Sequence, residues 1–254
     1  MRKSKEQIIK ELSETGISVI DNYFDEEYCN KAIHEIDNLL LIHKNSIQSK
    51  KTEETSGDER LFKIERESQC AKYFQADDFV NSILNSVSKN KIKSYFILGG
   101  KLTFNENETK NSGGGWHRDS DSEQFKAMVY LNDVDSSNGP FLFLKNSDQF
   151  DLERRENLEK VSFRTKIYIL MGKLKKHPPR YDDMTVEDYL IKSETKPTQV
   201  TGSKGTLVLF NSTYLHRGKN IEQGTRYTFT NYMFTNNFLS RYSRKKQFHS
   251  LFIK

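Results

Sequence analysis

The sequence GTLVLFNSTYLHRGKNIEQGTRYTFTNYMF, residues 205–234, contains the clearest strand signal in the chain. Two runs rich in β-branched and aromatic residues, 205–211 and 225–234, are separated by residues typical of turns. This pattern indicates antiparallel strands. His216 directly follows the first run and Arg226 opens the second. If the segment between them is a hairpin turn, the second strand brings the Arg226 guanidinium back beside the His216 imidazole.

The same signal recurs upstream, whereas the beginning of the chain has a helical pattern. The runs 125–134 and 139–146 are short, apolar and bounded by turn residues, and 17–21, 60–65 and 92–104 also favour strands. Helices are predicted over 4–14, from an N-cap at Asp25 to about residue 40, and over 76–88. Residues 43–60 are polar and predict a loop. We therefore expect one domain, 1–254, that is mainly β with flanking helices.

Two polar segments interrupt or follow this body. Residues 151–200 form a partly basic stretch between strand runs, and a segment of this length predicts an insertion or lid with short helices of its own. Residues 241–254 form a basic tail, for which a solvated surface segment is the simplest interpretation.

Composition limits the class of protein. The chain has 254 residues, 35% of them hydrophobic, which is enough for a core, and a net charge of +5 that is too weak to indicate a nucleic acid partner. Cys29 and Cys70 make no disulfide framework, the charged N-terminus lacks the apolar core of a signal peptide, and no apolar run is long enough to cross a membrane. These features predict a reduced, cytoplasmic protein.

The stretch SGGGWHRDSD, residues 112–121, predicts a metal site. Residues two apart on a strand point to the same side, so His117 and Asp119 can reach one ion. Of the other histidines, only His216 directly follows a strong strand run. Two imidazoles and one carboxylate on one face are typical of non-haem Fe(II) oxygenases. The glycines would let the backbone turn sharply at positive φ, and Trp116 would either shield the metal and line a cleft or belong to the core.

Two cations are candidates for binding an anion. Arg226 can hold a carboxylate through a two-pronged contact, although an ordinary surface arginine fits the same pattern. Lys126 shares one strand face with Met128 and Tyr130. If that face points into the barrel, Lys126 would pair with an anionic co-substrate or substrate, and otherwise it is a solvated lysine.

The order of His-X-Asp, a distal histidine and an arginine ten residues later resembles the Fe(II)/2-oxoglutarate-dependent dioxygenases. More closely, the chain resembles the phytanoyl-CoA dioxygenase-like family. The sequence WHRDSDSEQFKAMVYLNDVDSSNGPFLFLKNS (116–147) is similar to its first metal-binding segment, 205–234 to its second, and ELSETGISVIDNYFDEEYCNKAIHEIDNLL (11–40) to its N-terminal helix, strand and helix. The resemblance covers most of the chain outside 43–60, 151–200 and the tail.

This resemblance implies a double-stranded β-helix, or jelly roll, with His117, Asp119 and His216 as iron ligands and Arg226 as the anchor for the 5-carboxylate of 2-oxoglutarate. Thr228 shares the strand face of Arg226, so its hydroxyl can reach the same carboxylate, or it serves only as a good strand former. Many family members have Ser or Thr two residues after the distal histidine, where this chain has Gly218.

The function expected from these residues is an oxygenase that uses Fe(II), 2-oxoglutarate and O2 to hydroxylate a small molecule of anionic or saccharide-like character, releasing succinate and CO2. A non-catalytic binding protein on the same fold is one alternative, although it would have no need for all four residues. An oxygenase acting on nucleic acid is the other, and it lacks an aromatic and basic repeat to follow a strand.

Overall fold

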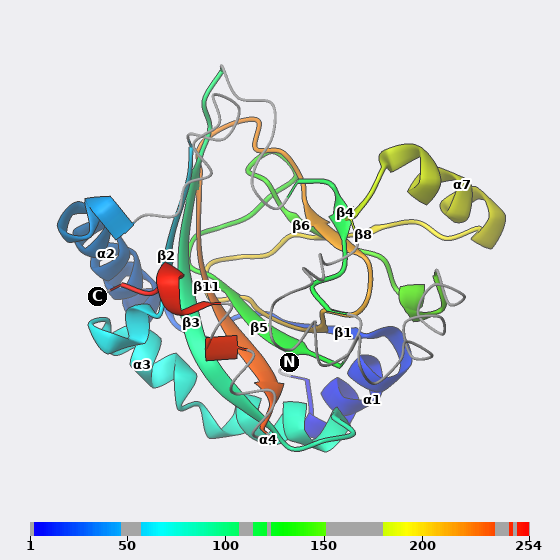
Figure 1. Ribbon diagram of the computed structural model, residues 1–254, viewed down its shortest axis with the longest axis horizontal. Coiled ribbons are helices and arrows are strands. Elements are labelled where there is room, and N and C mark those ends of the chain that lie inside the picture. The colour runs from blue at the N-terminus through cyan, green and yellow to red at the C-terminus, as the bar shows by residue number, and fades with distance from the viewer. Residues whose placement is uncertain are drawn as a thin grey trace, which may run out of the picture.

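The computed structural model describes residues 3–46, 57–106, 114–120, 123–150, 180–236, 244–245 and 248–253. Two antiparallel sheets face each other, and helices cover the outer side of the larger one (Figure 1). The chain folds as a double-stranded β-helix, which confirms the predicted fold class.

The larger sheet has six strands and includes the clearest strand runs of the sequence. In spatial order they are β1 (Ile17–Ile20), β9 (Leu207–Asn211), β5 (Phe125–Tyr130), β11 (Thr225–Thr235), β3 (Ile92–Thr103) and β2 (Asp58–Phe62). The smaller sheet contains β7 (Arg180–Tyr181), β4 (Trp116–His117), β10 (His216–Gly218), β6 (Phe141–Phe143) and β8 (Thr198–Val200). Strands β7 and β8 lie within the range 151–200 that the sequence predicts as an insertion, whose residues 151–179 are outside the described part of the chain.

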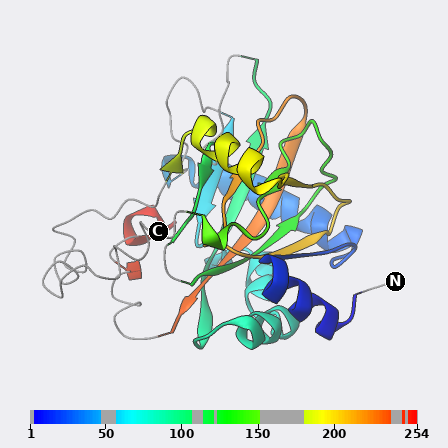
Figure 2. The ribbon, with the colours of Figure 1, turned by 90° about the vertical axis from the view of Figure 1, so that its right-hand side faces the viewer.

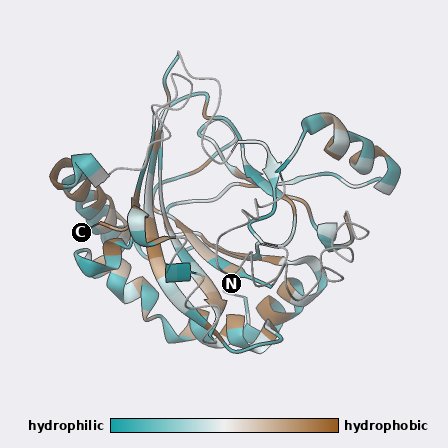
Figure 3. Ribbon diagram, in the orientation of Figure 1, coloured by the Kyte–Doolittle hydropathy of each residue, from teal (hydrophilic) through white to brown (hydrophobic). Residues whose placement is uncertain are grey.

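Four helices pack against the outer face of the larger sheet: α1 (Lys5–Thr15), α2 (Glu26–Ile42), α3 (Gln69–Gln75) and α4 (Asp78–Val87). Their apolar residues join outward-facing strand residues in one cluster, and Figure 3 shows brown and teal residues side by side along these helices. The predicted cap at Asp25 is confirmed, because its side chain accepts from the Tyr28 amide. A fifth helix, α7 (Asp183–Ser193), lies beside the smaller sheet (Figure 2).

The space between the sheets has a second apolar cluster, and the alternation of strand residues produces it. Met128 and Tyr130 of β5 point inward and pack against Phe141, Phe143 and Phe210. The Tyr130 hydroxyl donates to the Val200 carbonyl and accepts from the Phe141 amide, which ties the two sheets together. Lys126 lies two residues before Met128 on β5, so its side chain also points into the space between the sheets.

The predicted hairpin between 205–211 and 225–234 is wrong. Strand β10 pairs with β4 and β6 in the smaller sheet, whereas β11 pairs with β3 and β5 in the larger one. The connection after His216 thus crosses between sheets, and Arg226 faces the interior from the opposite wall.

Three other boundaries differ from those predicted. Strand β2 begins at Asp58, inside the expected loop, and the run 60–65 ends as a 3-10 turn at Ile64–Arg66. The tail is not wholly solvated: after a 3-10 turn at His249–Leu251, Phe252 forms a bridge with Phe62 and Ile253 is fully buried. Short 3-10 turns also occur at Lys44–Ser46 and Ser147–Gln149.

Candidate metal centre

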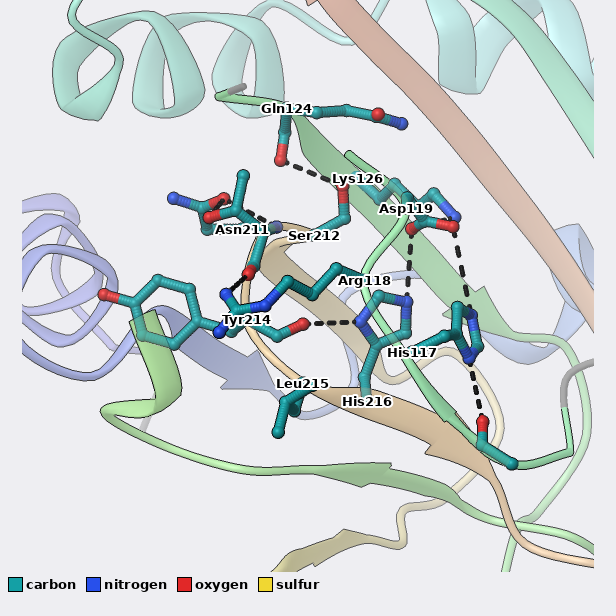
Figure 4. A network of polar contacts seen from close by, with 12 residues as sticks. His117, Arg118, Asp119, Gln124, Lys126, Asn211, Ser212, Tyr214, Leu215 and His216 are labelled. Carbon is teal, nitrogen blue, oxygen red and sulfur yellow. Dashed lines mark hydrogen bonds and ion pairs between the residues drawn. The ribbon is translucent and has the colours of Figure 1, made fainter. Parts of the chain in front are cut away.

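Three predicted ligands meet at one point on the inner wall of the barrel. The ligand atoms of His117, Asp119 and His216 all lie within 4.8 Å of one another. His117 and His216 are opposite one another in the pairing of β4 with β10, and their rings are 4.5 Å apart. Asp119 lies just beyond β4, where its amide donates to the Ser212 carbonyl. Figure 4 shows the carboxylate facing both imidazoles.

The hydrogen bonds of the two imidazoles turn the same ring nitrogen of each toward a common centre. His117 Nδ1 lies 2.9 Å from the Gly115 carbonyl oxygen, and His216 Nδ1 lies 2.9 Å from that of Tyr214. A carbonyl can only accept, so each Nδ1 carries a proton, and Nε2 is the ring nitrogen that faces the centre and could bind a metal. Gly115 has φ of +83°, which confirms the expected positive φ in the glycine run. The donor set therefore suits a divalent metal ion.

The pKa shifts of His117 and Asp119 favour the protonation states that suit metal binding. Burial, together with the neighbouring His216, lowers the pKa of His117 to about 3, so its ring is neutral at physiological pH. Burial alone would raise the pKa of Asp119, but the Lys126 ammonium and His216 hold it well below its usual range. The site thus presents a neutral imidazole and a carboxylate without any protonation change.

Arg118, between His117 and Asp119, fixes this segment and was not recognised from the sequence. Its side chain is fully buried and donates to the carbonyls of Thr213, Ser147 and Phe150. Nothing in the sequence distinguishes it from a solvated arginine. Trp116 is 3% exposed and packs with Leu142, Leu144 and Leu215, so it belongs to the core.

A cavity of about 220 Å³ extends from the triad along the inner face of β11. Alternate residues of that strand, Arg226, Thr228, Thr230 and Tyr232, line it. Lys126 lines it from β5, opposite Tyr232. The inward position that the sequence left open for Lys126 is therefore the one observed.

Arg226 is the cation in this cavity best suited to an added anion. No described residue accepts a hydrogen bond from its Nε, and burial lowers the pKa of its guanidinium. Arg60, on nearby β2, is already held by Asp58 through contacts of 2.9 and 3.0 Å. An incoming carboxylate would thus find an unpaired guanidinium at Arg226 and a paired one at Arg60.

The positions of Thr228 and Gly218 bear on the same anion. Thr228 is 7% exposed and its Oγ1 lies over Gly100, where an added Cβ would approach to 3.0 Å. Gly100 therefore makes room for this hydroxyl inside the cavity. Gly218 also lines the cavity but has no hydroxyl to offer the anion. Thr228, on the same strand face as Arg226, is a residue that could supply that hydroxyl instead.

A double-stranded β-helix with two histidines and a carboxylate converging on one wall defines the class of Fe(II)/2-oxoglutarate-dependent oxygenases. Within that class the chain belongs to the phytanoyl-CoA dioxygenase (PhyH) family, whose model matches residues 12–226. A search of curated protein sequences gave no match.

Solved structures of this class have the same fold. The epimerase SnoN of nogalamycin biosynthesis, with Fe3+, α-ketoglutarate and nogalamycin RO, shares 12% identity over 91% of this chain and 83% of its own, with a TM-score of 0.65. EctD from S. alaskensis with bound Fe shares 14% over 92% and 77%, with a TM-score of 0.66. HygX from Streptomyces hygroscopicus, with nickel, 2-oxoglutarate and hygromycin B, shares 16% over 93% and 89%, with a TM-score of 0.60.

These relatives do not share one reaction. Besides the epimerase, they include the carbocyclase SnoK, at 10% identity and a TM-score of 0.64. Likeness at such identities shows the fold alone. None of the described helices is long and apolar enough to cross a membrane.

Proposed function

We propose that the chain is an Fe(II)- and 2-oxoglutarate-dependent oxygenase that hydroxylates a small molecule and releases succinate and CO2. The observation that carries this proposal is the convergence of His117, Asp119 and His216 on the wall of a cavity that also contains the unpaired Arg226. When bound, iron with 2-oxoglutarate and O2 supplies the oxidising chemistry of this enzyme class.

The chain's own residues bind and orient the reactants. The two histidines and Asp119 would hold the metal, since their donor atoms are turned toward one point and fixed from behind by backbone carbonyls. Arg226 would bind the 5-carboxylate of 2-oxoglutarate through a charge-assisted pair, and the Thr228 hydroxyl would donate to the same group. Both lie on one face of β11, so one strand sets the orientation of the 2-oxo acid.

The substrate is proposed to be a small molecule that is anionic or saccharide-like. Arg180 and Arg217 also line the cavity. Arg180 is exposed to solvent, so its positive charge can attract an acidic group. HygX and SnoN, whose structures contain hygromycin B and nogalamycin RO, show that this fold accepts sizeable small molecules.

The test is succinate formation by the Fe(II)-loaded protein with 2-oxoglutarate under air. Metabolite extract fractions should stimulate it, and mass spectrometry under 18O2 should show a consumed compound whose product gains one labelled oxygen. A product that gains chlorine, or that gains no label, would contradict hydroxylation. Failure to bind metal and 2-oxoglutarate at all would favour the non-catalytic alternative, and a steep loss of activity with salt on nucleic acid would favour the other.

A further inference from the structure

Lys126 is a buried cation next to a proposed metal ligand. Its residue is 6% exposed, and its Nζ lies 2.7 Å from Asp119 Oδ2 and 4.1 Å from the centre of the Tyr232 ring. The other residues of β5 are apolar or aromatic: Phe125, Ala127, Met128, Val129 and Tyr130. Packing alone would therefore be served as well by an apolar side chain, without the cost of burying an ammonium group.

A cation here also opposes metal binding. A divalent ion held by His117, Asp119 and His216 would lie close to the Lys126 ammonium, and like charges repel strongly where water is excluded. The lysine must therefore contribute something that outweighs this repulsion, and its contact with Asp119 indicates what.

A carboxylate can bind a metal through one oxygen or through both. The Lys126 ammonium lies at hydrogen-bond length from Oδ2, and the Tyr232 ring behind it restricts its movement. Oδ2 also lies 3.1 Å from His216 Nε2, whereas Oδ1 lies 3.9 Å from His117 Nε2, so the ion pair with Lys126 leaves Oδ1 as the carboxylate oxygen more available to a metal. Figure 4 shows the Lys126 side chain reaching the carboxylate from β5, on a different strand from either histidine.

We propose that Lys126 is a positioning residue that restricts Asp119 to one-oxygen coordination. This inference rests on the proposed metal role of the triad. Three ligands on one face leave three positions of an octahedral ion open, and a chelating 2-oxo acid with O2 needs all three. An Asp119 free to chelate would occupy one of them.

The test counts water molecules on the metal, so it needs no substrate and no turnover. Mn(II) is bound to the parent and to Lys126→Met, and EPR line broadening in 17O-enriched water gives the number of bound waters. Lys126→Met should have one water fewer than the parent and equal or tighter Mn(II) binding, because a repelling charge is gone. Lys126→Arg should restore the parent number, because a guanidinium also donates to the carboxylate.

A surface lysine provides the matched control. Lys204 contacts Glu26 at 2.9 Å on the outside of the protein, so Lys204→Met should change neither the water number nor the affinity. If Lys126→Met does not fold by circular dichroism, Lys126→Leu, whose side chain also has no hydrogen-bond donor, is measured instead, with the same loss expected.

The outcomes separate this inference from the proposed function. Equal water numbers in the parent and the folded Lys126 variant would overturn the positioning role, as would weaker Mn(II) binding without a change in water number. A parent protein that binds no Mn(II) would instead refute the metal centre itself.

Discussion

Replacing Arg226 by alanine tests the link between the triad and the 2-oxo acid. Arg226 reaches the cavity from β11, whereas all three proposed metal ligands come from the smaller sheet or the segment just after β4. The substitution should therefore weaken 2-oxoglutarate binding and leave metal binding nearly unchanged.

The expected magnitude follows from the state of the guanidinium. No described residue accepts a hydrogen bond from Arg226 Nε, so a bound carboxylate would gain a charge-assisted contact with a half-buried guanidinium. Loss of such a contact costs about 2–4 kcal/mol, which corresponds to a roughly 30-fold to several hundred-fold rise in the dissociation constant. Arg226→Lys should fall between parent and alanine, because it keeps the charge and loses the two-pronged geometry.

Isothermal titration of 2-oxoglutarate into the Ni(II)-loaded protein measures this constant without turnover. Elemental analysis of the same samples confirms that each variant carries the metal. Lys219 provides a control in the same β10–β11 connection: its ammonium contacts Glu222 at 2.9 Å, and Lys219→Ala should bind 2-oxoglutarate like the parent.

Affinity within about threefold of the parent for Arg226→Ala would refute this reasoning, since threefold is under 1 kcal/mol. The 5-carboxylate would then bind elsewhere, and Arg60 is the next candidate because it lines the same cavity.

Three further outcomes are expected. His216→Ala should lose most of its metal on desalting, because two remaining ligands hold a labile ion poorly; elemental analysis showing an unchanged content would remove His216 from the site. Limited proteolysis followed by mass spectrometry should cut residues 151–200 more slowly once metal and 2-oxoglutarate are bound, and equal cutting would argue against a lid. Burial raises the pKa of Cys29 to about 11 and of Cys70 to about 12, so both thiols should stay protonated at neutral pH and react with a disulfide reagent only after denaturation; rapid labelling of the native protein would contradict this.

The sequence was sufficient to predict that the three proposed ligands lie together, because their signals are local. His117 and Asp119 are two residues apart, and His216 follows an unmistakable strand run. These three residues then come together as long as the segments that carry them belong to the same β-rich domain. The position of Arg226 relative to His216 was predicted less well. The eight turn-like residues after His216 are compatible with either a hairpin or a crossing between the two sheets.

Short or locally atypical elements escaped prediction for a related reason. Helix α3 has seven residues, too few for a helical period to be recognised, and β2 begins at Asp58, a residue depleted in strands. Phe252 and Ile253 end a basic tail, and their burial depends on contacts with Phe62, which lies far away in the sequence.

Arg118, Lys126 and Arg226 are ordinary basic residues in the sequence, and only the fold shows how far each is removed from water. Arg118 and Lys126 are buried, and Arg226 is half-buried in the wall of the cavity. For Arg118 the cost is offset by three backbone carbonyls, and for Lys126 by Asp119. For Arg226, no described residue accepts a hydrogen bond from Nε, and burial lowers the pKa of the guanidinium although the nearby Tyr130 and Asp58 act in the opposite direction.

The Arg226 guanidinium lines a cavity and has a free Nε donor, so it favours the binding of an anionic ligand there. The consequence can be measured apart from binding: without 2-oxoglutarate, Arg226→Ala should melt at the same temperature as the parent or higher, because it removes a charge that burial destabilises. With 2-oxoglutarate and metal present the order should reverse, because only the parent gains the stabilisation of a bound carboxylate. A variant that melts lower under both conditions would show that Arg226 stabilises the fold itself, and the argument for an anion at this end of the cavity would fail.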